Sequence, residues 1–113
     1  MKESVIQRLI IAWLKTNDIF CWRNNSVGVY DETSKSFRSQ VGVGALNGVS
    51  DILGVLNDGR LLAIEVKTQV GILSPAQSKF INAVNDRGGV AFVARSLDDA
   101  KTQLQRIIDG KNG

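Results

Sequence analysis

The sequence predicts a small α/β domain whose mixed central sheet is flanked by helices. Residues 2 to about 16 carry apolar side chains at helical spacing, whereas residues 50–56 and 61–67 are short apolar runs of strand composition. A helix, a strand and a second helix are expected to follow them. With 113 residues the chain can form one compact domain with one hydrophobic core, which we expect to span residues 1–113.

The remaining elements follow in order along the chain. A strand over 19–25 leads into an irregular stretch over 26–48, in which a polar tip over 31–35 is expected. The last strand covers 90–94 and is followed by a helix whose end, over 110–113, should fray.

Two helix starts are visible in the sequence. Ser74, Pro75 and Gln77 have the spacing of an N-cap, a first-turn proline and a capping-box glutamine. Ser96 is placed to cap the last helix, and the acidic side chain of Asp98 behind it suits the helix dipole.

Composition excludes several kinds of chemistry. The chain has no histidine and one cysteine, Cys21, so it can form no internal disulfide, no zinc finger and no His-dependent catalytic centre. A net charge of +3 favours phosphate-bearing partners only modestly. The apolar stretch 5–14 is too short to span a bilayer, and no signal peptide is evident, so we expect an intracellular protein without a membrane partner.

A nucleotide cofactor is also not expected. Gly42, Gly44 and Gly48 are spaced G-x-G-x-x-x-G, and a strand rather than a helix follows them, so they fail the dinucleotide-binding pattern. Close approach of the backbone beside Asp51, to substrate phosphates or otherwise, explains these glycines better.

Asp51, Glu65 and Lys67 are the candidate site. If the loop between the two strands has three residues with Gly59 left-handed, Asp51 lies opposite Glu65. Lys67 then shares their face, because strand side chains alternate. A two-residue loop would instead turn Asp51 away from Glu65. We predict the three-residue loop.

Two carboxylates beside an ammonium group suit metal-dependent hydrolysis of a phosphodiester. Mg²⁺ prefers oxygen ligands and needs only one or two carboxylates besides substrate phosphate. The metal lowers the pKa of a bound water, and a lysine can orient that water or stabilise developing charge. The structural alternative is an ion pair between Lys67 and one of the carboxylates.

Further polar residues are candidate DNA contacts. Arg23 and Asn24 end the first expected strand, where they can contact backbone phosphate or simply enter a turn. Lys35 and Arg38 lie near the tip of the long loop, which can lie against DNA or form a solvated hairpin.

The ordered motifs resemble the VRR-NUC (virus-type replication-repair nuclease) domain of the PD-(D/E)XK nuclease superfamily. Ser50 stands where that superfamily usually has proline, in a position that shapes the turn and supplies no ligand. The resemblance covers about residues 1 to 97. It rests on Glu3-Ser-Val-Ile-Gln7, Arg23-Asn-Asn25, Gly48-Val-Ser-Asp51, Glu65-Val-Lys67 and Leu73-Ser-Pro-Ala-Gln77.

The resemblance implies roles for these residues. Asp51, Glu65 and the Val66 carbonyl would hold Mg²⁺ or Mn²⁺, and Lys67 would position the attacking water. Glu3, which shares a helix stripe with Gln7, would approach the metal, although an acidic first turn also suits the helix dipole. Gln77 would help orient the water, in competition with its capping role.

The resemblance also implies a substrate. Stand-alone relatives are associated with dimers that cut four-way DNA junctions, so the first expectation is a homodimeric Holliday junction resolvase. A flap or nicking endonuclease is the alternative among enzymes. A catalytically idle DNA-binding module is the alternative outside them.

Overall fold

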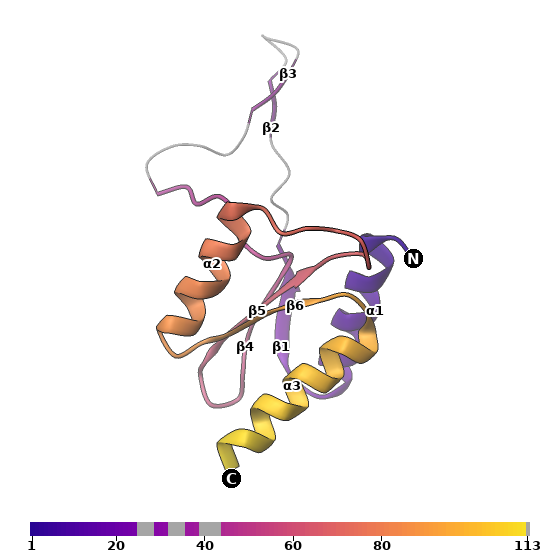
Figure 1. Ribbon diagram of the computed structural model, residues 1–113, viewed down its shortest axis with the longest axis vertical. Coiled ribbons are helices and arrows are strands. Elements are labelled where there is room, and N and C mark those ends of the chain that lie inside the picture. Colours follow the sequence, from indigo (N-terminus) through magenta and orange to yellow (C-terminus); the bar gives the residue numbers. More distant parts are fainter. Residues whose placement is uncertain (25–28, 32–35, 39–43, 113) are drawn as a thin grey trace.

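The computed structural model describes residues 1–24, 29–31, 36–38 and 44–112 (Figure 1). Within these ranges three α-helices and six β-strands are present. In chain order they are α1 (Glu3–Thr16), β1 (Phe20–Arg23), β2 (Val29–Asp31), β3 (Ser36–Arg38), β4 (Ile52–Val55), β5 (Leu61–Val66), α2 (Pro75–Asp86), β6 (Val90–Ala94) and α3 (Leu97–Asn112).

Four strands form a mixed sheet in the order β1-β4-β5-β6. The pairs β1–β4 and β4–β5 are antiparallel, whereas β6 runs parallel to β5. Helix α2 covers one face of this sheet, and α1 and α3 cover the other (Figure 1). Within the described part of the chain, strands β2 and β3 pair with each other in a separate two-stranded sheet. The predicted α/β fold with a mixed sheet is confirmed.

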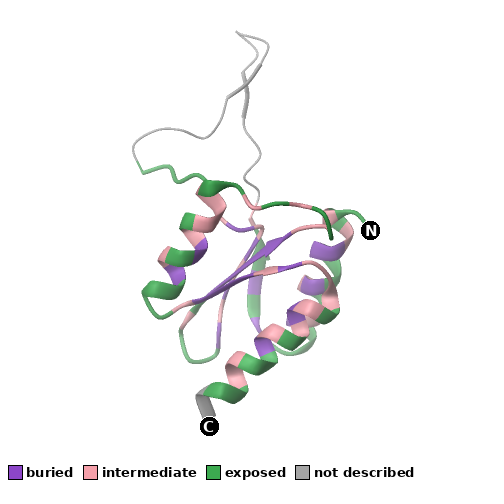
Figure 2. Cartoon of the chain, in the orientation of Figure 1, coloured by how far each residue is buried: buried purple, intermediate pink, exposed green. Residues whose placement is uncertain are grey.

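The hydrophobic core lies on both faces of the sheet. Leu62, Ile64 and Val66 point toward α1 and α3 in the larger cluster, whereas Ala63 points toward α2 in the smaller one. Because helices lie on both sides, β5 is buried from Leu62 to Val66 (Figure 2). A charged side chain in this strand is therefore removed from water and needs a partner.

The turn between β4 and β5 has the predicted three residues. The Leu56 amide donates to the Arg60 carbonyl at 2.9 Å, and Gly59 has a φ of +93°. Glycine suits this turn because a left-handed φ strains residues that carry a Cβ. Ile52 pairs with Ile64, so the next position sets Asp51 opposite Glu65. The predicted register is confirmed.

Other expectations are met in part. The stretch predicted to be irregular contains β2 and β3, and the polar tip predicted over 31–35 lies outside the described residues except for Asp31. The end of α3 differs from the prediction, because the helix continues through Gly110 to Asn112. No helix in the described part of the chain is long and apolar enough to cross a lipid bilayer.

Candidate functional site

Asp51, Glu65 and Lys67 lie along one face of the sheet. Asp51 directly precedes β4, Glu65 is the next-to-last residue of β5, and Lys67 directly follows β5. Ile64 and Val66 point into the core under α1 and α3, so the residues that alternate with them point to the face that carries α2. The structure thus brings the three predicted residues to one place, named here the carboxylate row.

The Asp51 side chain ends the pairing of β4 with β5. Its Oδ2 accepts a hydrogen bond of 2.9 Å from the Val66 amide, which points toward the β4 side of β5. In an extended strand the carbonyl of a residue points the same way as its amide. The Val66 carbonyl is therefore directed to the side where the Asp51 carboxylate lies.

Glu65 is an acid buried next to another acid. Its side chain is only 2% exposed. Burial raises the pKa of Glu65 to about 9, helped by a hydrogen bond with Asp51 and by the charge of Asp51, while Lys67 acts in the opposite direction. Without a cation, Glu65 thus keeps its proton at neutral pH and is hydrogen-bonded to Asp51. A bound cation would replace that proton and let Glu65 ionise.

The donor set fits a hard divalent cation. Asp51, Glu65 and the Val66 carbonyl offer oxygen ligands only, as Mg²⁺ and Mn²⁺ prefer. Among the described residues no group of three His, Cys, Asp or Glu side chains is close enough to hold a metal, so substrate phosphate and water would complete the coordination. Glu3, half-buried in the first turn of α1, reaches Glu65 through its charge, which raises the pKa of Glu65 further.

Gln7 lies one turn along α1 from Glu3 and adds an acceptor. Its side chain is 8% exposed, and its Oε1 accepts no hydrogen bond from the described residues. A buried amide oxygen without a donor is costly, and water bound to a cation is a strong donor. This orphaned atom is an unused acceptor one turn from Glu3, the residue of α1 whose charge reaches Glu65.

Lys67 is held by a loop that the sequence did not single out. Its amide donates to the Ala94 carbonyl at 3.1 Å, which continues the pairing of β5 with β6. Arg95, directly after β6, donates from Nη1 to the carbonyls of Thr68 at 2.6 Å and Gly71 at 2.7 Å. A Cβ added at Gly71 would lie 3.3 Å from Lys67 Cδ, so this loop borders the lysine stem. Arg95 therefore ties down the loop that follows Lys67.

Gln77 caps helix α2, which is one of the two roles that the sequence allowed for it. Its Oε1 accepts from the Ser74 amide at 2.8 Å, and its own amide donates to Ser74 Oγ at 3.1 Å. Both halves of the predicted capping box are thus formed. The Gln77 Nε2 group makes no hydrogen bond within the described part of the chain, so only this end is available to a substrate or water.

Gly48 explains how the loop before β4 meets α2. It has a φ of +80°, and a Cβ added there would overlap the Ala76 carbonyl group. At Gly48 the expected close approach of the backbone is made to the start of α2. No described residue lies within 4 Å of a Cβ added at Gly44, and Gly42 lies outside the described residues.

Of the four residues predicted to contact DNA, one lies beside the carboxylate row. The Asn24 amide donates to the Asp51 carbonyl at 2.7 Å. Asn24 therefore lies beside the carboxylate row, next to the outer strand β1. Arg23 is exposed, but it alternates with Asn24 and points to the opposite face. Lys35 lies outside the described residues. Arg38 ends β3, and its side chain is likewise outside them.

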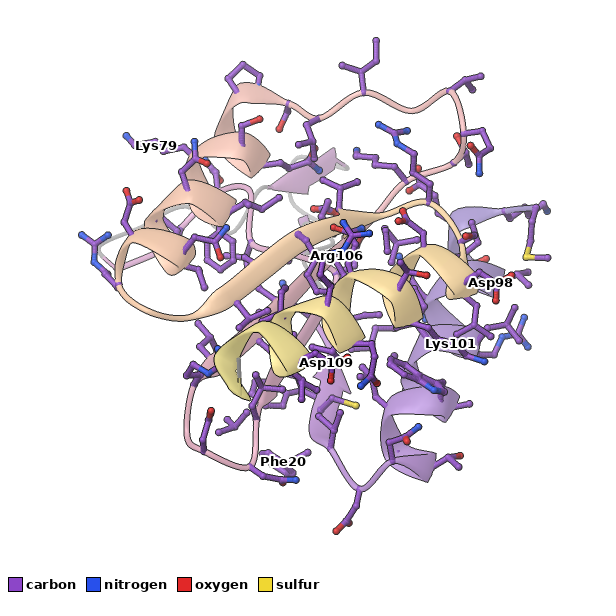
Figure 3. The ribbon with its side chains drawn as sticks, turned by 60° about the horizontal axis from the view of Figure 1, so that its bottom comes forward. Phe20, Lys79, Asp98, Lys101, Arg106 and Asp109 are labelled. Atoms are coloured by element: carbon purple, nitrogen blue, oxygen red, sulfur yellow. The ribbon has the colours of Figure 1, made fainter. Side chains whose placement is uncertain are left out.

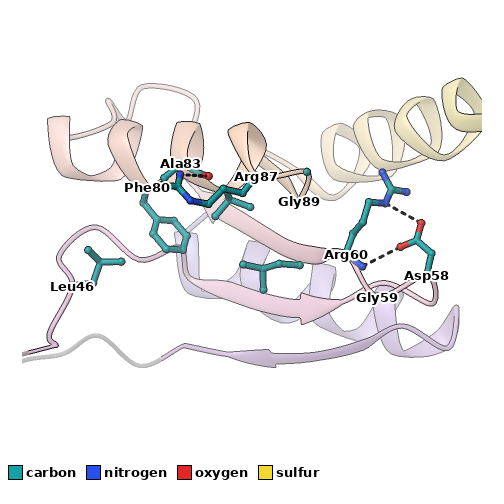
Figure 4. Close-up of a pocket in the computed structure, with 11 residues that line it drawn as sticks. Leu46, Asp58, Gly59, Arg60, Phe80, Ala83, Arg87 and Gly89 are labelled. Carbon is teal, nitrogen blue, oxygen red and sulfur yellow. Dashed lines mark hydrogen bonds and ion pairs between the residues drawn. The ribbon is translucent and has the colours of Figure 1, made fainter.

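An apolar hollow beside α2 lies apart from the carboxylate row. A pocket of about 460 Å³ lies between α2 and the β4–β5 turn, and Phe80, Leu61 and Leu46 line it (Figure 4). At its rim Arg60 pairs with Asp58 at 2.9 Å. None of the carboxylate row lines this pocket, so its chemistry is separate from that of the row.

Comparison with known proteins agrees with the geometry. The VRR-NUC domain family matches residues 1–98. A solved structure described as a VRR_NUC domain protein has a similar fold, with a TM-score of 0.67 and 20% sequence identity, over 96% of this chain and 89% of that one. No curated protein matches the chain. The family match covers most of the chain, and this protein therefore belongs to the VRR-NUC family of nucleases.

Proposed function

We propose that the protein is a Mg²⁺- or Mn²⁺-dependent, structure-specific DNA endonuclease, and that as a homodimer it resolves Holliday junctions. The observation that carries the catalytic part is the carboxylate row. It sets a buried Glu65 against Asp51, with Lys67 on the same face. Such a pair of acids is unfavourable in an apolar sheet unless a cation or a proton compensates it.

Each residue of the row has a distinct task. Asp51, Glu65 and the Val66 carbonyl would hold the cation, which when bound lowers the pKa of a water and offsets phosphate charge. The Lys67 ammonium group would orient the attacking water and stabilise negative charge that develops on the phosphate. Gln77 Nε2 would donate a hydrogen bond to the same water, while its oxygen stays in the capping box.

The junction substrate is supported by symmetry rather than by a single contact. A C2 dimer presents two identical sites related by a two-fold axis, and a four-way junction has matching symmetry. A chain that stays monomeric at micromolar concentration would be inconsistent with paired cuts.

The test is a cleavage assay with four substrates in parallel. A four-way junction, a 5′ flap, a nicked duplex and an intact duplex are incubated with Mg²⁺ or Mn²⁺ and with wild type, Lys67→Ala or Lys79→Ala. Lys79 is an exposed lysine of α2 outside the row, so it controls for general loss of positive charge.

We expect paired symmetric cuts in the junction, which Lys67→Ala abolishes and Lys79→Ala leaves intact. Cleavage of flaps or duplex instead would keep the nuclease and refute the resolvase. No cleavage of any substrate would refute the endonuclease proposal for the isolated chain.

A further inference from the structure

On the sheet face that carries α2, the outer strand β1 turns exposed side chains to the outside. Among the described residues, helix α2 packs mainly on β5 and β6. Phe20 and Trp22 point outward from β1 here, with exposed fractions of 69% and 42%. Their cross-strand partners on β4, Val55 and Leu53, are half-buried. Figure 3 shows Phe20 at the periphery of the fold, well apart from Lys79 on α2.

This aromatic pair is in line with the carboxylate row. Trp22 pairs with Leu53, and Asn24, which directly follows β1 and alternates onto the same face, donates from its backbone amide to the Asp51 carbonyl. Trp22 is thus two residues, or about 7 Å along the strand, from the position that lies beside Asp51. That distance corresponds to about two stacked nucleotides, at roughly 3.4 Å each.

The two rings leave an outer face free. Their centroids are 5.6 Å apart and their planes are inclined by 55°, so they contact each other and no base fits between them. A base can stack only on an outward face of Trp22 or Phe20. Bases in an intact duplex are already stacked on their neighbours, so such a site selects unpaired ones.

We propose that Phe20 and Trp22 form a stacking site for unpaired nucleobases of the DNA strand whose phosphate enters the carboxylate row. The inference rests on the proposed nuclease function, because it extends the same site along β1. Lys15, which borders the same hollow as Phe20, supplies positive charge at one end of the pair, against one acid, Asp18, in that hollow.

A second copy of the chain is the other conceivable occupant of this apolar face. Aliphatic and aromatic side chains would serve such a contact equally well. The placement of two rings in register with the carboxylates favours a nucleobase, since stacking needs a π-face and a strand that continues to the scissile phosphate.

Binding is measured in EDTA, so that cleavage does not intervene, with the full chain and fluorescently labelled DNA. The probes are oligothymidine, a 5′ flap and a blunt duplex. The variant Phe20→Leu/Trp22→Leu keeps the apolar surface and removes both rings. The single variant Trp22→Phe keeps an aromatic ring at each of the two positions. In a Trp13→Phe background Trp22 is the sole tryptophan and reports stacking directly.

We expect the leucine variant to bind oligothymidine and the flap about tenfold more weakly, with less than about twofold change for the blunt duplex. Trp22→Phe should retain most of the affinity, and oligothymidine should quench Trp22 fluorescence. Unchanged affinity for oligothymidine, or an equal loss on the blunt duplex, would overturn the proposal.

Two further results separate this inference from its alternatives. If Trp22→Ser turns a dimer into a monomer in sedimentation velocity while DNA affinity stays unchanged, the face joins two copies and the stacking site is wrong. If wild type cleaves DNA with Mg²⁺ but the leucine variant cleaves flap and duplex in the wild-type ratio, the stacking site fails and the nuclease stands. Quenching and selective loss of affinity would support stacking even without cleavage.

Discussion

Replacing Glu65 with glutamine should stabilise the metal-free protein, and the gain should grow as the pH rises. The folded state raises the pKa of Glu65 from 4.5 to about 9, so between these values it binds a proton that the unfolded chain releases. The free energy of unfolding of wild type therefore falls as the pH rises through this range. Glutamine keeps the shape of the protonated acid and has no proton to lose.

The size of the effect follows from the shift. Each pH unit between the two pKa values is worth about 1.4 kcal/mol, so the full effect from about pH 4.5 to 7 is about 3 kcal/mol. Asp51 and Lys67 beside Glu65 are half exposed, so solvent screens part of the interaction. We therefore expect Glu65→Gln to gain about 2 kcal/mol over wild type between these two pH values.

The assay is urea unfolding in EDTA, followed by circular dichroism at several pH values. Asp86→Asn, which removes an exposed carboxyl group at the end of α2, is the matched control and should follow wild type. A difference between Glu65→Gln and wild type that stays constant with pH would refute the reasoning. It would mean that Glu65 titrates alike in the folded and unfolded states.

Four other outcomes follow from the structure. Mn²⁺ affinity of wild type should rise with pH up to about 9, measured by calorimetry, because Glu65 must lose its proton before it can bind the ion; a flat profile would contradict this. Arg95→Ala should lower the free energy of unfolding by about 1–2 kcal/mol in urea titrations, since the two carbonyls that Arg95 binds lose their donor. The same variant should cleave DNA more slowly, and full activity would show that Arg95 does not position Lys67. Gly48→Ala should lower the free energy of unfolding by about 2 kcal/mol more than the control Gly44→Ala in the same titrations, because both residues have positive φ but only Gly48 meets Ala76. Equal losses in the two variants would show that the contact with Ala76 does not limit this position. Ser74→Ala should lower the melting temperature, at a cost of about 1 kcal/mol for the lost cap; an unchanged value would mean that the cap is replaced.

The grouping of Asp51 with Glu65 could be predicted from the sequence because a local turn determines it. Gly59 after two polar residues selects a three-residue turn, and that turn fixes the register. Strand alternation then puts Asp51 and Glu65 on one face. The start of α2 was predicted for the same reason, since Ser74, Pro75 and Gln77 follow a local capping pattern.

Contacts between distant segments could not be predicted in this way. Arg95 binds the carbonyls of Thr68 and Gly71, which are far from it in the chain, and no local pattern specifies backbone acceptors. Gly48 meets Ala76 only because β4 and α2 are packed together. Phe20 and Trp22 have the alternating pattern of a strand, and only the position of α2 over β5 and β6 leaves them exposed.

Binding of Mn²⁺ in the absence of DNA tests the central claim most directly. Isothermal calorimetry would compare wild type with Asp51→Asn and with Asp98→Asn, which removes an exposed carboxyl group in the first turn of α3. If the carboxylate row is a metal site, wild type and Asp98→Asn bind Mn²⁺ alike, and Asp51→Asn binds it at least about tenfold more weakly. No binding by wild type, or equal binding by Asp51→Asn, would contradict the claim that these carboxylates hold a metal.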